Sequence, residues 1–338
     1  MGCSAIKYVA ACALSISAVA CFTFKFMKNF AFIFPGQGSQ SVGMLDAWGD
    51  HPAVVEVLKT ASDALGEDVA KLIKEGPKEA LGLTTNTQPV MLVAGVAAYR
   101  AWIAEGGAQP AALAGHSLGE YSALVASGVL SLHDAVRTVR LRAAAMQEAV
   151  PVGMGAMAAV LGLSATEVIA ACAASTSATG EIAEAVNFND PAQTVIAGSK
   201  LGVEKASELL KAKGAKRCLP LPVSAPFHSS LMKPAAERLR AHLATLTFNA
   251  PQIPVINNID VAAVSDAAQI KDALYRQAFG PVRWVECALA IKARGIAHLV
   301  ECGPGKVLAG MCKRIDADLV GAAMFDPATL LETKLLLA

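Results

Sequence analysis

A strand, a tight turn and a helix follow one another directly after residue 110. Ala111 to Gly115 is a short apolar run that predicts a buried strand, and residues 115–119 read Gly-His-Ser-Leu-Gly. Glycines around a serine let the backbone turn sharply, so the hydroxyl of Ser117 is expected to stand at the carboxyl edge of a sheet. The helix that follows directs free N–H groups toward a developing oxyanion. This pattern favours an α/β fold with a serine nucleophile.

The rest of the first half alternates in the same way. Phe30 to Phe34 predicts a strand, ended by Pro35-Gly36, and apolar periodicity predicts helices at about 44–62, 88–105 and 131–149. Strands that alternate with helices are typical of a parallel sheet covered by helices on its faces.

The pattern changes after residue 152. Strands are expected at 155–161, 182–187, 193–198 and 216–219, with helices at 164–174 and 200–213 between them. The order β-α-β-β-α-β predicts a small ferredoxin-like α+β subdomain. Beyond it the sequence predicts a helix from about 230, a strand near 254–256, helices near 266–277 and 284–294, a strand at 297–301 and a last helix at about 306–315.

Composition allows a large core and gives no electrostatic reason for binding nucleic acid. Of the 338 residues 54% are hydrophobic, and the formal net charge is only +1. The eight cysteines form no Cys-x-x-Cys pair and no zinc-like spacing with histidine, so they are expected to be buried thiols in a reducing compartment. They are Cys3, Cys12, Cys21, Cys172, Cys218, Cys287, Cys302 and Cys312.

The first 29 residues form an apolar N-terminal extension. Tyr8 to Phe24 is uncharged and mostly apolar, with a length typical of the hydrophobic region of a signal peptide rather than of a spanning helix. Met27 stands directly before the first strand and makes a natural initiator. We therefore expect translation from Met27 and a cytoplasmic protein, with membrane association only if residues 8–24 are retained.

A serine needs a base within hydrogen-bond reach to act as a nucleophile at neutral pH. His116 adjoins Ser117, but neighbouring side chains at a tight turn point apart. Four further histidines fall in helical or strand patterns, where a surface or capping role is the default: His51, His133, His242 and His298. His228 lies in a proline-containing loop just before a helix, where positioned catalytic groups tend to occur, and is favoured as the base.

Two other segments are candidates for the site. Residues 35–40, Pro-Gly-Gln-Gly-Ser-Gln, can present backbone N–H groups to an anion but lack the lysine of a phosphate-binding loop. Arg142 follows Arg137 and Arg140 on one predicted helix and faces a different direction from Arg140. Solvent exposure is the default for all three arginines.

These motifs together resemble the malonyl-CoA:acyl-carrier-protein transacylases of fatty-acid synthesis. The resemblance covers residues 30–327 through FPGQGSQ at 34–40, GHSLGEYSAL at 115–124, GAMAAV at 155–160, VNFNDPAQTVIAG at 186–198, PVSAPFHSSLM at 222–232 and VECGPGKVL at 300–308. It implies a hydrolase-like parallel-sheet core at 30–151 and 222–327, with the ferredoxin-like subdomain at 152–221.

The resemblance also implies a role for particular residues. Ser117 would be the acylated nucleophile and His228 its general base, and the N–H groups of Gln37 and Leu118 would form the oxyanion hole. Arg142 would bind the free carboxylate of the malonyl group. Gln277 would orient the imidazole of His228 through its backbone carbonyl. The implied reaction is ping-pong transfer from malonyl-CoA to acyl carrier protein, with no metal and no other cofactor.

Two alternatives stay open on the residues alone. A serine hydrolase such as a thioesterase would use the same turn with water as the acceptor, although no acidic residue stands out as the third member of a triad. A catalytically silent acyl-binding or scaffold protein is disfavoured by the presence of Ser117, His228 and Arg142 together. The pathway served, fatty-acid synthesis or polyketide assembly, is also open.

Overall fold

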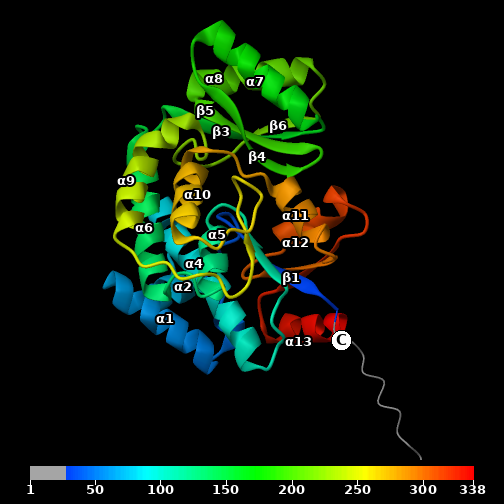
Figure 1. The fold of residues 1–338 in the computed structure, drawn as a ribbon. Helices are drawn as coiled ribbons and strands as arrows, with labels where there is room; N and C mark the ends of the chain where they lie inside the picture. Colours follow the sequence, from blue (N-terminus) through cyan, green and yellow to red (C-terminus); the bar gives the residue numbers. More distant parts are fainter. Residues whose placement is uncertain (1–27) are drawn as a thin grey trace, which may run out of the picture.

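The computed structural model describes residues 28–338 and contains two sheets, each covered by helices (Figure 1). The expectations for Met27 and for the apolar run at 8–24 lie outside the described residues. The strands of the larger sheet are all parallel and lie in the order β7 (Val255–Ile256), β2 (Ala112–Gly115), β1 (Phe30–Phe34), β8 (His298–Cys302) and β9 (Val320–Met324).

Alternation along β1 explains how this sheet is covered. Phe30, Phe32 and Phe34 point into one buried apolar cluster, and Ala31 and Ile33 point into another. Successive side chains of a strand face opposite sides of the sheet, so a fully apolar strand requires helices on both faces. The first layer includes α1 (Pro52–Leu65), α4 (Thr84–Ala104) and α6 (Leu132–Ala149), and the second includes α11 (Trp284–Lys292) and α12 (Val307–Ile315).

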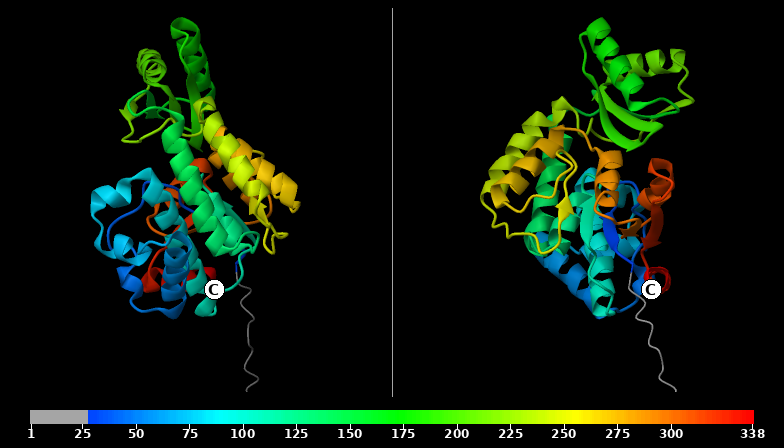
Figure 2. Two further views of the ribbon diagram at one scale, coloured as in Figure 1. Left: turned by 90° about the vertical axis from the view of Figure 1, so that its left-hand side faces the viewer. Right: turned by 45° about the vertical axis from the view of Figure 1, so that its right-hand side comes forward.

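The smaller sheet is antiparallel and has the order β4-β5-β3-β6. Its elements along the chain are β3 (Gly155–Leu161), α7 (Ala165–Thr179), β4 (Ala183–Asp190), β5 (Gln193–Ser199), α8 (Lys200–Ala212) and β6 (Arg217–Pro220). This is the ferredoxin-like arrangement that the sequence predicts. The subdomain stands at one end of the molecule in both views of Figure 2, with α7 and α8 on the side away from the core.

β4 ties the subdomain to the core. The N–H of Phe188 donates to the carbonyl of Val282, the N–H of Val282 donates to the carbonyl of Val186, and Arg314 pairs with Asp190 at 2.8 Å. The two sheets are therefore joined by backbone hydrogen bonds as well as by the crossing chain.

The remaining helices complete the core. They are α2 (Val69–Glu75), α3 (Lys78–Gly82), α5 (Gly119–Ala126), α9 (Lys233–Ala244), α10 (Ala267–Phe279) and α13 (Pro327–Leu337), with short 3-10 turns η1 (Asp46–Trp48) and η2 (Ser230–Met232). Lys28 lies beside the end of α13, because its N–H donates to the carbonyl of Leu337. None of the helices formed by residues 28–338 combines the length and apolar character needed to span a bilayer.

The sequence-based elements were wrong or incomplete in the following places. The single helix expected at 44–62 is the turn η1, followed by α1 from Pro52, because Gly49 adopts a φ of 53° that interrupts the helix. The ring of His51 then caps α1 by accepting a hydrogen bond from the N–H of Ala53. Short α2 and α3, the edge strand β9 and the C-terminal helix α13 were missed.

Candidate active site

Ser117 lies in the turn between β2 and α5, and the turn differs from expectation in one respect. Ser117 itself has a positive φ of 52°, whereas Gly115 and Gly119 do not. The two glycines are needed for close packing instead. A Cβ on Gly115 would lie 1.9 Å from the backbone of Gly119, and one on Gly119 would lie 2.1 Å from the carbonyl oxygen of Phe34. The serine therefore carries the backbone strain and the glycines provide the space for it.

His228 meets Ser117 from a loop far along the chain. Its Nε2 lies 2.6 Å from Oγ of Ser117, and its Nδ1 lies 2.9 Å from the carbonyl oxygen of Gln277 and 3.2 Å from that of Gly280. Carbonyl oxygens only accept hydrogen bonds, so Nδ1 carries the ring hydrogen and Nε2 is free to accept the serine proton. The choice of His228 over His116 agrees with this geometry.

The environment of His228 keeps its imidazole neutral. Burial and the nearby guanidinium of Arg142 lower the pKa of His228 to about 3. Its two carbonyl partners belong to the end of α10 and the residue after it, where helix carbonyls lack intrahelical partners. The negative end of the helix dipole therefore lies beside the ring, where it stabilises the imidazolium that forms when the serine loses its proton.

The side chain of His116 points toward the ferredoxin-like subdomain rather than toward Ser117. Its Nε2 lies 2.9 Å from Oδ1 of Asn189 on β4. Burial lowers the pKa of His116. This residue therefore links the nucleophile turn to the subdomain.

Arg142 faces the site and not the solvent. It is 2% exposed, whereas Arg137 is exposed and Arg140 pairs with Glu67 near the surface. Its Nη2 donates to Oγ of Ser117 at 3.2 Å, and its Nη1 donates to Oε1 of Gln88 at 2.8 Å. The default of solvent exposure is thus wrong for Arg142, and the role implied by the resemblance has a geometric basis.

One hydrogen-bond donor of the Arg142 guanidinium has no partner in the described part of the chain. Its Nε–H is buried and has no hydrogen-bond acceptor within residues 28–338. Burial lowers the pKa of Arg142, but arginine starts so high that the group stays charged. A buried cation with an unfilled donor next to a serine nucleophile suits a substrate that carries its own carboxylate.

The loop at 35–37 lies against the nucleophile turn. A Cβ on Gly36 would lie 2.8 Å from the carbonyl oxygen of His116, so only glycine permits this approach. The N–H groups of Gln37 and Leu118 donate to no acceptor within the described part of the chain, residues 28–338. Both N–H groups therefore lack an intramolecular partner among these residues, and the oxyanion-hole role that the resemblance implies for them stays a prediction.

Three buried polar residues that the sequence did not single out support the site through hydrogen bonds. Asn258 accepts from the N–H of Ser117 at 2.7 Å and donates to the carbonyl of Gly115 at 2.7 Å. Gln88 holds Arg142, and Glu120 receives two N–H donors. Glu120 had a signal in the sequence, since it is the one acid in the otherwise uncharged stretch Gly119–Ala126.

The fold and site together define a class of enzyme. A parallel α/β sheet presents a serine on a strained turn, a neutral histidine is hydrogen-bonded to it, and two backbone N–H groups stand ready. This is an acyltransferase that works through a serine nucleophile. Among residues 28–338 no group of histidines, cysteines and acids has the arrangement of a metal site.

The comparisons with known proteins narrow the class. The acyl transferase domain family matches residues 31–316. The malonyl CoA-acyl carrier protein transacylase of Salmonella typhimurium is 53% identical over 305 residues, which are 90% of this chain and 98% of the relative, and that of Escherichia coli is 52% identical over the same shares.

Solved structures agree with the sequence relatives. The acyl-carrier-protein S-malonyltransferase of Burkholderia pseudomallei has a TM-score of 0.89 at 63% identity, covering 90% of this chain and 99% of its own. A complex of a type II PKS acyl-carrier protein with its malonyl-transacylase has a TM-score of 0.89 at 47% identity, covering 91% and 100%. The chain belongs to the malonyl CoA-acyl carrier protein transacylase family.

Proposed function

We propose that this chain transfers the malonyl group of malonyl-CoA to the phosphopantetheine thiol of acyl carrier protein through a malonyl-Ser117 intermediate. The observation that carries the proposal is the position of the serine oxygen. Oγ of Ser117 lies 2.6 Å from Nε2 of His228 and 3.2 Å from Nη2 of Arg142. The nucleophile thus lies between a neutral base and a buried cation.

In the first half-reaction Oγ of Ser117 attacks the thioester carbon while its proton passes to Nε2 of His228. The N–H groups of Gln37 and Leu118 stabilise the oxyanion. The C–S bond then breaks, and the leaving CoA sulfur takes the proton from His228. In the second half-reaction the carrier thiol gives its proton to His228 and attacks the acyl carbon. The C–O bond to Ser117 breaks, and the serine oxygen recovers the proton.

Arg142 supplies the preference for malonyl over unsubstituted acyl groups. A planar guanidinium binds a carboxylate through charge-assisted hydrogen bonds, and those bonds are stronger where water is excluded. Because Arg142 touches the attacking oxygen itself, a carboxylate bound to it holds the acyl carbon close to Oγ.

Gln277 takes the place of the acid of a serine-histidine-acid triad. Its backbone carbonyl fixes the ring hydrogen of His228 on Nδ1 without adding a negative charge. A neutral support of this kind places no negative charge in direct contact with His228.

The proposal extends to the protein partner of the enzyme, its location in the cell and the limits of its two structural parts. The carrier protein is proposed as the second substrate because the relatives carry that activity in their names and one similar structure is a complex with an acyl-carrier protein. We place the enzyme in the cytoplasm, where malonyl-CoA is made. We also propose that the core comprises residues 30–151 and 222–327, with α13 packed against it, and that residues 152–221 form the subdomain.

Intact-mass analysis after incubation with malonyl-CoA, followed by peptide mapping, tests the proposal. We expect a single malonyl adduct on Ser117 that persists in water and disappears when the carrier thiol is added. Continuous release of CoA in water at the rate of transfer would identify a hydrolase instead. An adduct on another residue would contradict the assignment of the nucleophile.

A further inference from the structure

Glu120 lies beneath the site, three residues after Ser117, and takes no part in the steps described above. Its side chain is 2% exposed. One oxygen, Oε2, accepts from the backbone N–H of Asn258 at 2.9 Å and from Nε2 of Gln277 at 3.0 Å. A buried carboxyl is costly unless such donors compensate it, so its presence here needs a reason.

The first donor leads to the nucleophile. Asn258 follows β7, and β7 lies beside β2 in the sheet, so the residues after both strands meet at the same edge. The side chain of Asn258 accepts from the N–H of Ser117 and donates to the carbonyl of Gly115. Glu120 thus fixes the backbone of Asn258 through one hydrogen bond, and the side chain of Asn258 joins the two ends of the strained turn.

The second donor leads to Arg142. Nε2 of Gln277 donates both to the carbonyl of Ser117, at 3.0 Å, and to Glu120, while its Oε1 accepts from Nη2 of Arg142 at 3.2 Å. A guanidinium only donates and a carboxylate only accepts. The amide of Gln277 therefore has one satisfactory orientation, and the carboxylate of Glu120 is one of the two acceptors that set it.

We propose that Glu120 is a positioning residue, whose carboxylate aligns the turn of Ser117 through Asn258 and the guanidinium of Arg142 through Gln277. This inference rests on the proposed roles of Ser117 and Arg142. Protonation of the carboxyl at Oε1 would leave Oε2 in place and make it a weaker acceptor for both donors. The aligned form of the site is therefore the form with Glu120 charged.

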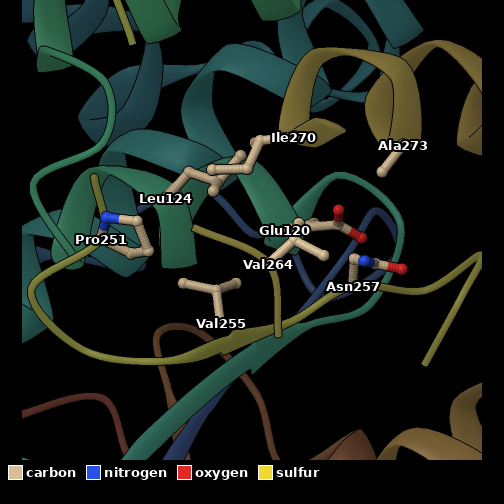
Figure 3. A pocket seen from close by; sticks show the side chains of 8 residues that line it. All are labelled: Glu120, Leu124, Pro251, Val255, Asn257, Val264, Ile270 and Ala273. Carbon is tan, nitrogen blue, oxygen red and sulfur yellow. The ribbon is translucent and has the colours of Figure 1, made fainter. Parts of the chain in front are cut away.

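The surroundings of Glu120 bring the pKa of its carboxyl into the pH range in which acylation can be measured. Burial raises the pKa of Glu120 to about 7, against the opposing effect of the donors Gln277 and Asn258 and of Arg142. The other titratable groups that face it are Asp260 after β7, Cys287 on α11 and Tyr121 beside it on α5. Glu120 also lines a small, largely apolar cavity, shown in Figure 3 with Leu124, Val255 and Ile270.

His228 does not titrate in the same range, because its pKa is lowered to about 3. We therefore expect the rate of malonyl-Ser117 formation to rise with pH through an ionisation near the value of about 7 that burial gives Glu120. Deprotonation is the activating direction, so the rate is low below this ionisation and level above it.

Glu120→Gln tests the inference by rapid-quench measurement of acylation over about pH 5.5 to 8.5. The amide keeps the shape and one acceptor and cannot ionise, so it imitates the protonated acid. We expect a rate about tenfold below the wild-type plateau, from the weaker acceptor, and no rise near pH 7. A wild-type rate, or a retained rise, would overturn the inference.

Glu301→Gln is the matched control. Glu301 is a second buried glutamate, on β8, whose pKa burial raises to about 7, and its Oε2 accepts from the N–H of Ala309 on α12. This variant should keep the wild-type ionisation. If the ionisation vanishes with Glu301 instead, it does not belong to Glu120 and the inference fails.

Two further outcomes are also decisive: a Glu120→Gln variant that does not fold, and a failure of the proposed function itself. If Glu120→Gln does not fold, the wild-type and Glu301→Gln profiles carry the test, and the lack of any ionisation near pH 7 in them overturns the inference. Intact mass is recorded on the same samples. A wild-type enzyme without a Ser117 adduct contradicts the proposed function, whereas a normal adduct with an unchanged Glu120→Gln profile contradicts this inference alone.

Discussion

Ser117 and His228 share an unusual backbone conformation, with φ values of 52° and 65°, and their side chains meet at 2.6 Å. A residue other than glycine in this region carries a strain of about 1–3 kcal/mol. The N–H of Ser117 donates to Asn258 and the imidazole of His228 donates to the carbonyl of Gln277, and these hydrogen bonds oppose that strain. The surrounding fold therefore holds the pair in position before any substrate arrives.

Replacing His228 should slow acylation far more than replacing its neighbour. Loss of a general base typically lowers the rate by about 10²–10⁴-fold, and we expect His228→Ala to fall in that range. His116→Ala is the comparison, because His116 contacts Asn189 and not Oγ of Ser117. Rapid-quench acylation with malonyl-CoA measures both variants. A larger loss in His116→Ala would show that the base was wrongly chosen.

Arg142→Ala should separate malonyl from acetyl transfer. Charge-assisted hydrogen bonds contribute about 1.5–3 kcal/mol each, so kcat/KM for malonyl-CoA should drop by roughly 10²-fold or more. Acetyl-CoA lacks the carboxylate, and its kcat/KM should hold steady or rise. Arg140→Ala, on the same helix but paired with Glu67, should change neither. A parallel loss with both substrates would mean that Arg142 supports the structure.

Gly119→Ala should destabilise the protein through close contact and not through backbone angles. The new Cβ would lie 2.1 Å from the carbonyl oxygen of Phe34, so the turn and β1 must separate. We expect a loss of at least about 3 kcal/mol in the free energy of unfolding, at the upper end of overpacking effects. Gly310→Ala, inside α12 with nothing within 4 Å of its Cβ, should gain up to about 1 kcal/mol. Urea unfolding of the two variants checks the contrast.

Glu301→Gln should become more stable relative to the wild type as the pH rises. Burial raises the pKa of Glu301 from 4.5 to about 7 in the folded protein. The stability that the protonated carboxyl contributes is full below pH 4.5 and is lost as the pH rises through the folded value. The free energy of unfolding of the variant, relative to that of the wild type, should therefore be about 2 kcal/mol higher at pH 8 than at pH 5. Thermal unfolding at the two pH values measures this difference. Glu332→Gln, on the exposed face of α13, should show no such shift.

The local pattern of the sequence was enough to predict most elements and the nucleophile. Phe30–Phe34 and the strand-turn-helix around Ser117 were placed within a residue, since an apolar run between turn signals is a local property. The order of strands and helices at 155–220 likewise predicted the ferredoxin-like subdomain. The missed elements, α2, α3, β9 and α13, are short or lie at the edge and end of the fold, where burial leaves a weak periodic pattern.

Only the tertiary structure decided how the polar groups around Ser117 are arranged, and it added Asn258, Gln88 and Glu120 to those that the resemblance named. Asn258 reaches it across 141 positions and His228 across 111, because the sheet order places β7 beside β2 and the loop after β6 above them. The direction of Arg142 depends on packing of α6 against α4 and on Gln88, and the role of Glu120 depends on the amide of Gln277. Periodicity fixes which face of an element is buried, whereas strand order and packing decide which buried polar groups meet.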